Sequence, residues 1–194
     1  MKKIFFILTF LIFFNTKFVL ATEENKKAGY SSIVSYKKIL YESNFDLSQF
    51  TFGNNRFFKK YTIKKVLERY KSPLKENIDD FIRVCINHEI DCYLLPSIAG
   101  LESTFGHYIF PDSFNPFGWG GGYIIFKDFK EAIEKVASSL KNNYLNRGLL
   151  TVEQIATVYS ESPIWAKRVR FFIREFEKEE NNLRLYFEKY EVKL

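Results

Sequence analysis

The strongest constraint on the fold comes from the apolar segment of residues 93–105. Its large apolar residues recur at the spacing of one helix face, and they are Leu94, Ile98, Leu101 and Phe105. Asp91 precedes the segment and is placed to cap the helix by accepting a backbone hydrogen bond from its first turn. Glu102 lies four residues after Ile98, so the helix would carry this carboxyl group on or beside its most apolar face.

Helical signals continue on both sides of this segment. Ser72 and Pro73 mark the start of a helix that we expect to end near His88. Further helices are expected at residues 32–41, 63–70, 130–144 and 151–159, and from about residue 163 toward the C-terminus. Thr151 with Gln154 three residues later fits a capping box. The expected fold class is therefore mainly α.

Residues 111–122 are rich in proline, glycine and asparagine, which predicts a loop. We expect it to lead into an extended segment or short β-hairpin at residues 123–126.

The first 21 residues have the pattern of an export signal. Lys2 and Lys3 precede the apolar run 4–14, and Val19, Leu20 and Ala21 provide a cleavage site after Ala21. An uncleaved membrane anchor is the alternative, but the run is shorter than the about 20 residues of a spanning helix. The pattern predicts an exported protein of the periplasm or cell envelope that meets the membrane only through this segment.

The charge of the chain is modest once this leader is removed. Loss of Lys2, Lys3 and Lys17 lowers the formal charge from +6 to +3, and acidic residues are interspersed with the remaining basic ones. Nucleic-acid binders usually cluster their basic residues on one face, so we expect no nucleic-acid partner. The glycines of residues 118–122 lack the spacing of a phosphate-binding loop, and no cofactor is expected.

Cys85 and Cys92 are the only cysteines, and export would permit a disulfide between them. The alternative is two free thiols, with Cys85 packed in the core and Cys92 at the start of the next helix. His88 and His107 do not complete a zinc-binding set with them, so no metal site is expected.

Glu102 is the first candidate for a catalytic group. Burial disfavours the ionised form of a carboxyl group and raises its pKa, which suits a general acid that protonates a leaving glycosidic oxygen. The alternative is a structural glutamate, neutralised by a buried arginine such as Arg168 or Arg170.

Three short motifs follow one another between residues 94 and 160. They read LLPSIAGLESTFG at 94–106, NPFGWG at 115–120 and IATVYS at 155–160. The first resembles the catalytic helix of bacterial lytic transglycosylases and glucosaminidases, which ends in Glu-Ser followed by an aromatic residue. The second is similar to the Asn-x-Phe-Gly loop of the glucosaminidases. The third lies where transglycosylases carry an Ala-Tyr-Asn-Ala-Gly-like motif.

The resemblance covers about residues 72–172 and has two departures. The Gly-Leu-Met-Gln stretch of many transglycosylases is absent, and Tyr159 is followed by Ser160 and Glu161 instead of Asn-Ala. The resemblance implies a lysozyme-like helical domain that cleaves β-1,4 bonds between the N-acetylated sugars of peptidoglycan, with the glycan strands as its partner.

The resemblance also implies roles for individual residues. Glu102 would be the catalytic acid and base, and Tyr159 would orient the sugar or stabilise developing charge. The expected substrate-binding residues are Ser103, Asn115, Phe117, Trp119 and Tyr123. A second carboxylate could come from Asp112, Asp128 or Glu161. In transglycosylases a single glutamate suffices, because a hydroxyl of the substrate closes an anhydro ring.

The expected layout is a signal peptide at 1–21, a helical extension at 22–71, a catalytic domain at 72–176 and an amphipathic C-terminal helix at 177–194. The missing motif elements leave a second hypothesis, a non-catalytic module that binds peptidoglycan. A third is a secreted helical protein that contacts partner proteins through residues 171–194.

Overall fold

The computed structural model describes residues 56–189 of the 194-residue chain. They form the helices α2 (Arg56–Arg69), α3 (Ile78–Asn87), α4 (Leu94–Ser103), α5 (Phe129–Asn143), α6 (Val152–Tyr159) and α7 (Trp165–Lys189). Short 3-10 turns occupy Pro73–Asn77 and Leu145–Arg147. The expected mainly α class is confirmed over these residues. The leader, the expected helix at residues 32–41 and the start of the expected extension lie outside them.

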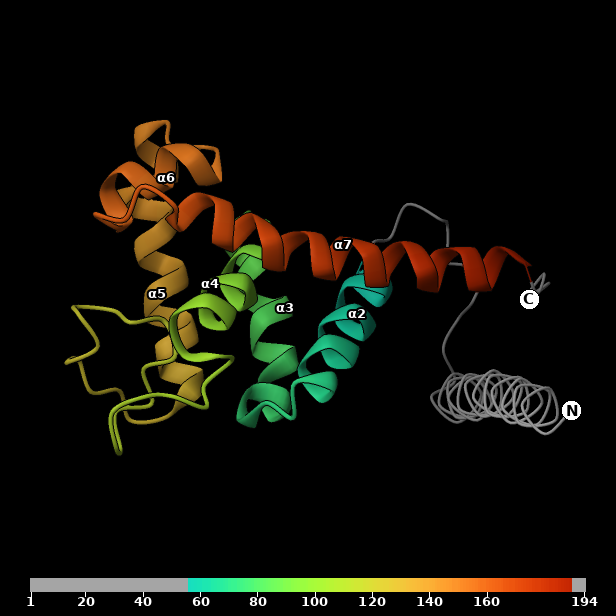
Figure 1. Cartoon of the computed structure of the whole chain (residues 1–194), viewed down its shortest axis with the longest axis horizontal. Helices are drawn as coiled ribbons and strands as arrows, with labels where there is room; N and C mark the ends of the chain where they lie inside the picture. The colour runs from blue at the N-terminus through green and yellow to red at the C-terminus, as the bar shows by residue number, and fades with distance from the viewer. Residues whose placement is uncertain (1–55, 190–194) are drawn as a thin grey trace, which may run out of the picture. The chain divides into compact units, whose positions relative to one another are not determined.

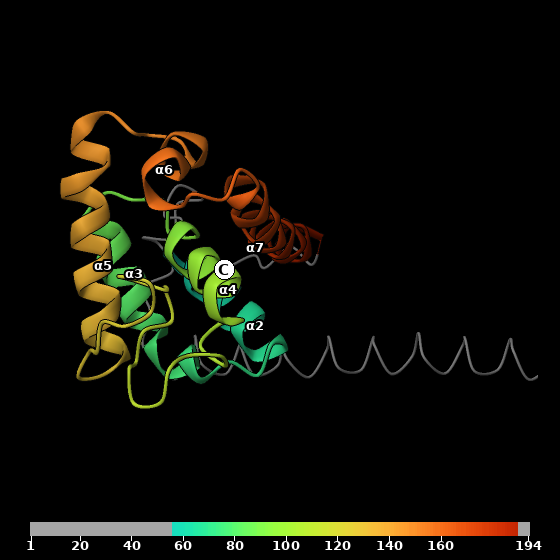
Figure 2. The same cartoon turned by 60° about the vertical axis from the view of Figure 1, so that its left-hand side comes forward.

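The long helix α7 spans this part of the molecule and organises it. It packs against α2, α4 and α6, while α3 packs between α2 and α5 (Figure 1). Turning the view by 60° separates α5 and α6 from α7 and shows the long loop between α4 and α5 beside the foot of α5 (Figure 2). This loop, residues 104–128, follows directly after Glu102.

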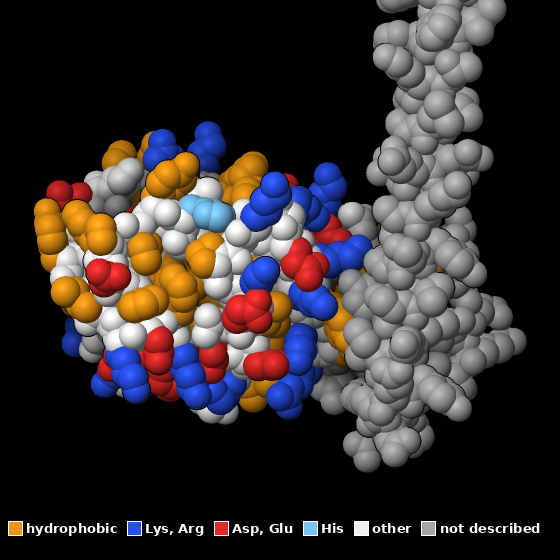
Figure 3. Space-filling model, turned by 90° about the horizontal axis from the view of Figure 1, so that it is seen from below, with side chains coloured by type: hydrophobic (Ala, Val, Ile, Leu, Met, Phe, Trp, Pro, Cys, Tyr) orange, Lys and Arg blue, Asp and Glu red, His pale blue; other side chains and the backbone are white. Residues whose placement is uncertain are grey.

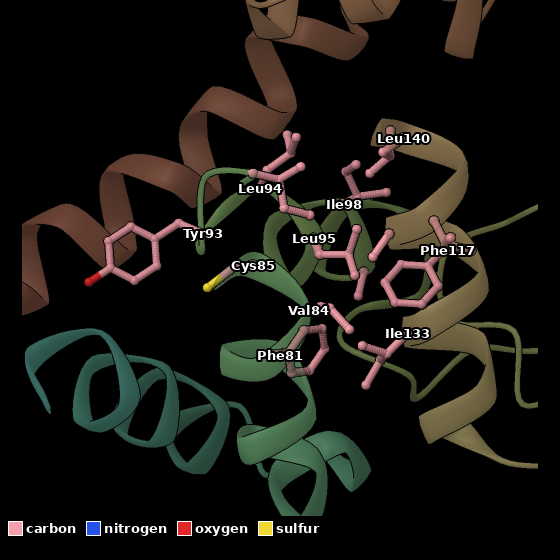
Figure 4. Close-up of a cluster of buried hydrophobic side chains, with 14 of the residues drawn as sticks. Phe81, Val84, Cys85, Tyr93, Leu94, Leu95, Ile98, Phe117, Ile133 and Leu140 are labelled. Atoms are coloured by element: carbon pink, nitrogen blue, oxygen red, sulfur yellow. The ribbon is translucent and has the colours of Figure 1, made fainter. Parts of the chain in front are cut away.

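The core forms where α3, α4 and α5 meet. Figure 4 shows Phe81 and Val84 of α3, Leu95 and Ile98 of α4, and Ile133 of α5 pointing toward one another. Phe105, which follows α4, is also fully buried, and its ring meets the ring of Phe172 from α7 edge-on at 5.2 Å. The apolar face expected for residues 93–105 is thus the central packing surface.

The domain boundaries expected near residues 72 and 176 do not coincide with any break in packing. Ile63 and Leu67 of α2 are fully buried in the same core as α3 and α4. Helix α7 continues without interruption through residue 176, because its buried stripe of Trp165, Val169, Ile173 and Phe176 runs on to Leu183. The described residues therefore belong to one unit.

Glu180 is a buried acidic residue within the apolar stripe of α7, and polar and charged side chains bind its carboxylate. Its carboxylate accepts hydrogen bonds from Lys59 of α2 at 2.9 Å, from the Tyr93 hydroxyl at 2.6 Å and from Arg184 at 2.9 Å. Burial opposes the ionisation of Glu180, but these three hydrogen bonds outweigh it and hold the pKa of the carboxyl below its usual range. The cluster ties α2 to α7.

A disulfide joins Cys85 of α3 to Cys92, two residues before α4. It resolves the alternative left open by the sequence and fixes the turn between the two helices. The expected capping of α4 by Asp91 is wrong: its carboxylate accepts a hydrogen bond from the backbone amide of Tyr93 at 2.7 Å, but Tyr93 precedes the helix, whose first turn has no side-chain cap. The capping box of Thr151 and Gln154 is present at the start of α6.

The hairpin expected near residues 123–126 is not found, since residues 56–189 contain no strand. Phe126 donates one backbone hydrogen bond to Ser113 at 2.8 Å, and no ladder continues from it. The carbonyl of Ile124 accepts a hydrogen bond from the side chain of Asn115 at 3.0 Å, where a strand would need a backbone partner.

Within the described residues, 56–189, no helix combines the length and the apolar character needed to cross a membrane. These residues also contain no group of three or more histidine, cysteine, aspartate or glutamate residues placed to hold a metal ion.

Candidate active site

Glu102 lies in the last turn of α4, where the helix ends abruptly. Thr104 and Phe105 adopt left-handed backbone angles with φ of 51° and 56°, and Gly106 follows with φ of 88°. Non-glycine residues rarely adopt this conformation, and it costs roughly 1–2 kcal/mol per residue. The backbone amide of Phe105 closes the helix by donating to the carbonyl of Ala99 at 2.9 Å.

Two buried serines hold this turn in place. The Ser103 hydroxyl accepts from the amide of Gly106 at 2.8 Å and lies 2.8 Å from the carbonyl of Pro116, to which it donates. The Ser72 hydroxyl donates to the carbonyl of Phe105 at 2.7 Å. Ser103 was expected to bind substrate, but its buried hydroxyl is engaged with the backbone. It anchors the turn that follows Glu102.

Asn115 shapes the glycine-rich loop across from Glu102. Its side-chain amide donates to the carbonyls of Trp119 at 2.8 Å and Ile124 at 3.0 Å, and its oxygen accepts from the amide of Trp119 at 3.0 Å. Asn115 is expected to bind substrate, but its buried side chain and these three hydrogen bonds support a role in holding the shape of the loop.

The loop then passes directly over the carboxyl group of Glu102. Gly118 has a φ of 62°, and a β-carbon at this position would lie 3.1 Å from Oε2 of Glu102. The backbone reaches this close approach because residue 118 has no side chain.

Trp165, the first residue of α7, supplies the hydrogen-bond partner of Glu102. Its indole nitrogen donates to Oε1 of Glu102 at 2.7 Å. The Trp165 ring stacks on the ring of Tyr159 with centroids 4.7 Å apart, and the Tyr159 hydroxyl donates to the carbonyl of Phe117 at 2.9 Å. Tyr159 thus braces both Trp165 and the glycine-rich loop.

The arginine pairing considered for Glu102 is absent from the described contacts. Arg170 binds the carboxylate of Glu153 with two hydrogen bonds of 2.9 Å, and Arg168 is exposed. Glu102 is therefore not neutralised by either residue.

The surroundings of Glu102 favour its protonated form. Burial of the carboxyl group among α4, the glycine-rich loop and α7 raises its pKa, and the hydrogen bond from Trp165 opposes this rise. The residue as a whole is nevertheless exposed, so solvent reaches part of its side chain. Burial also raises the pKa of the Tyr159 hydroxyl well above its usual value, and the negative charge of Glu102 adds to this effect. A carboxyl group that has a raised pKa and can be reached from solvent suits the role of a general acid.

Glu102 lies in the wall of an open cleft of about 610 Å³. The residues that line the cleft with it are His107, Tyr108, Ile109, Phe110, Pro111, Asn115, Gly118, Gly121 and Gly122. The ring of Phe110 stacks on the ring of Tyr123 at 5.1 Å, and Tyr108 and Tyr123 are each more than three-quarters exposed. Figure 3, seen from below, shows hydrophobic side chains gathered on the left of the face and charged ones on its right and lower edge.

The remaining residues expected to bind substrate occupy different environments. Phe117 is fully buried in the core, so its side chain does not reach the cleft. Trp119 is half-buried, packs edge-on against Tyr159 at 5.5 Å, and lines a smaller pocket of about 270 Å³ on the glycine-rich loop. Tyr123 is exposed beside Phe110. Trp119 and Tyr123 therefore remain available to a ligand.

None of the three candidates for a second carboxylate lines the cleft. Asp128 caps α5 by accepting from the amide of Glu131 at 2.7 Å. Asp112 and Glu161 are exposed in loops and are not among the cleft-lining residues. Glu102 is the only carboxylate among the described residues that line this cleft.

The sequence does not predict that Trp165 contacts Glu102. The spacing of Trp165 with Val169 and Ile173 indicates that it faces the core, but no local pattern relates it to a glutamate 63 residues earlier. Only the packing of α7 across α4 brings the two together.

Sequence comparison identifies no relative of this protein. No protein-family model matches the chain, and no curated protein matches it significantly. An inference of function therefore rests on the motifs and on the geometry around Glu102.

Proposed function

We propose that this protein cleaves the glycan strands of peptidoglycan at β-1,4 bonds between N-acetylated sugars, using a lysozyme-like helical domain. The observation that carries the proposal is the setting of Glu102. It is a carboxyl group with a raised pKa, in the wall of an open cleft with exposed aromatic rings beside it. Such rings offer flat apolar faces to sugar rings.

Glu102 would first act as a general acid. Its proton passes to the glycosidic oxygen as the bond from that oxygen to the anomeric carbon breaks, and positive charge develops on the sugar. The raised pKa of Glu102 favours the protonated form that this step requires.

The lack of a second carboxylate along the cleft favours a route in which the substrate supplies its own nucleophile. A hydroxyl of the same sugar attacks the anomeric carbon and closes an anhydro ring. Its proton passes to the carboxylate of Glu102, which restores the acid. The products are one strand end with a free hydroxyl and one anhydro sugar, and no water is consumed.

In this proposal Tyr159 holds the surroundings of Glu102 in place. Its hydroxyl donates to the carbonyl of Phe117 in the glycine-rich loop, and its ring stacks on Trp165, so it contacts the elements on both sides of the Glu102 carboxyl group. Trp119 and Tyr123 are the expected residues that contact sugar.

The test compares the purified chain with its Glu102→Gln variant on isolated peptidoglycan. Glutamine keeps the shape of the side chain but cannot donate the catalytic proton. We expect the wild type to release soluble fragments, the variant to release none, and both to sediment with the wall. Equal release by the two proteins would contradict the role of Glu102. Binding by both without any release would instead identify a non-catalytic module.

A further inference from the structure

We propose that Trp165 is a positioning residue for the carboxyl group of Glu102, holding Oε1 so that Oε2, beside Gly118, is the oxygen that exchanges a proton with the ligand. This inference rests on the proposed function for its consequence in turnover. The contact itself can be tested without turnover.

The contact is short and rigidly supported. The indole nitrogen lies 2.7 Å from Oε1, and Trp165 is only 3% exposed. Its ring is stacked on Tyr159 at an interplanar angle of 29°, and its backbone amide donates to the carbonyl of Ser162 at 3.1 Å. Since the Tyr159 hydroxyl is bound to the glycine-rich loop, the indole cannot shift without disturbing the wall of the cleft.

The chemistry of the indole group determines which oxygen carries the proton. An indole N–H donates a hydrogen bond and cannot accept one. Oε1 therefore presents a lone pair to Trp165. The carbonyl oxygen of a carboxylic acid accepts a hydrogen bond better than its hydroxyl oxygen, so in the acid form this contact favours the proton on Oε2. Oε2 is the oxygen that a β-carbon on Gly118 would approach to 3.1 Å, and Gly118 lines the cleft with Glu102. Trp165 thus orients the acidic proton toward the wall that a ligand would contact.

Other titratable groups around Glu102 do not perform this task. Tyr159 of α6 directs its hydroxyl to the Phe117 carbonyl. His107, from the turn after α4, is bound through Nε2 to the carbonyl of Tyr70. Tyr108 lines the cleft from an exposed position. Among the described residues, the side chain that donates a hydrogen bond to the Glu102 carboxyl group is that of Trp165, through its indole N–H.

The first test is Trp165→Phe, which keeps an aromatic ring on Tyr159 and removes the donor. We expect kcat to fall by about 10-fold to 100-fold while KM changes little, since misplacing a reacting group costs about that much. In the wild type, the hydrogen bond from Trp165 lowers the pKa of Glu102. Without this bond the pKa of Glu102 should rise, so the alkaline limb of the pH profile should move to higher pH. Phe171→Leu is the control, because Phe171 is an exposed aromatic residue of the same helix outside the cleft, and this change should leave kcat and that limb in place.

The second test does not depend on catalysis or on the stability of a tryptophan variant. The indole proton of Trp165 is followed by NMR in the wild type and in Glu102→Gln while the pH is varied. We expect it to titrate with the Glu102 carboxyl in the wild type and to stay constant in the variant. An indole proton insensitive to pH in both proteins would overturn the contact.

The two tests separate the possible failures. If the indole proton titrates but no fragments are released from peptidoglycan, the proposed function fails and the contact stands. If the wild type is active and Trp165→Phe matches it in kcat and in pH profile, the positioning role is wrong.

Discussion

The backbone of Gly118 lies directly against the carboxyl group of Glu102, so that a β-carbon there would stand 3.1 Å from Oε2. This is tighter than an ordinary van der Waals contact, and the carboxyl group is held on its other oxygen by Trp165. Glu102 therefore has little room to yield to an added methyl group.

Gly118→Ala should impair activity more than stability. We expect kcat/KM to fall by at least about 10-fold, because a displaced acid loses its alignment with the leaving oxygen. Gly148→Ala is the matched control. Gly148 lies outside the cleft and also has a left-handed backbone, with φ of 85°, but a β-carbon there would meet nothing within 4 Å. Each variant should lose about 1–2 kcal/mol from its left-handed backbone. An equal loss of activity in both, measured beside thermal unfolding, would contradict the special position of Gly118.

The carboxylates outside the cleft should be dispensable for turnover. Asp112→Asn, Asp128→Asn and Glu161→Gln should each release peptidoglycan fragments at close to the wild-type rate, since none of these residues lines the cleft. Asparagine at residue 128 can still cap α5. A loss of activity in any one variant, with its stability unchanged, would identify a second catalytic carboxylate.

The disulfide between Cys85 and Cys92 should stabilise the helix that carries Glu102. It closes a short loop with a sequence separation of 7. A loop of this length should contribute about 2.5 kcal/mol in the chain-entropy model. The Cys85→Ala, Cys92→Ala double variant should therefore melt roughly 5–10 °C below the wild type. A reducing agent should lower the melting temperature of the wild type and leave that of the variant unchanged. A wild type unaffected by reduction would contradict a stabilising bridge.

Glu180 should make stability depend on pH on the acidic side. Its carboxyl is buried, and hydrogen bonds from Tyr93, Lys59 and Arg184 hold its pKa below the value of the unfolded chain. The resulting stabilisation is complete above the unfolded pKa, and it is lost as pH falls through the lower folded pKa. Glu180→Gln should destabilise the protein by on the order of 2 kcal/mol at neutral pH, because the half-buried cations Lys59 and Arg184 lose their counter-charge.

Urea unfolding at several pH values checks this prediction. The gap between the wild type and Glu180→Gln should narrow as the solution is acidified. The exposed Glu177→Gln serves as control and should stay within about 0.5 kcal/mol of the wild type. A gap that does not change with pH would show that the carboxylate charge is not what stabilises the contact between α2 and α7.

The sequence predicts the helices well where local signals are strong. The apolar spacing of Ile98 and Phe105 places the core face of α4, and the Thr151–Gln154 capping box places the start of α6. These features depend on residues three or four apart, which the helix itself brings together. Helix α2 is longer than expected, because its outer turn is stabilised by α7 and not by its own pattern.

The direction of loop side chains could not be predicted in the same way. Asn115 and Phe117 follow each other in a glycine-rich loop, where polar and aromatic residues are typical of ligand binding. Both are buried, because Asn115 satisfies three backbone groups of its own loop and Phe117 completes the core between α4 and α5. The contact of Trp165 with Glu102 is beyond sequence reasoning for a related reason, since it exists only once α7 crosses α4.

The central claim is that Glu102 cleaves glycan strands without a second carboxylate, and the most direct measurement follows the fate of water. Isolated peptidoglycan is digested in water enriched in heavy oxygen, and the released fragments are identified by mass spectrometry. We predict anhydro-ended fragments without the heavy isotope from the wild type, and no fragments from Glu102→Gln. Reducing ends that carry heavy oxygen would contradict the single-carboxylate route, and an absence of fragments from the wild type would contradict the enzyme itself.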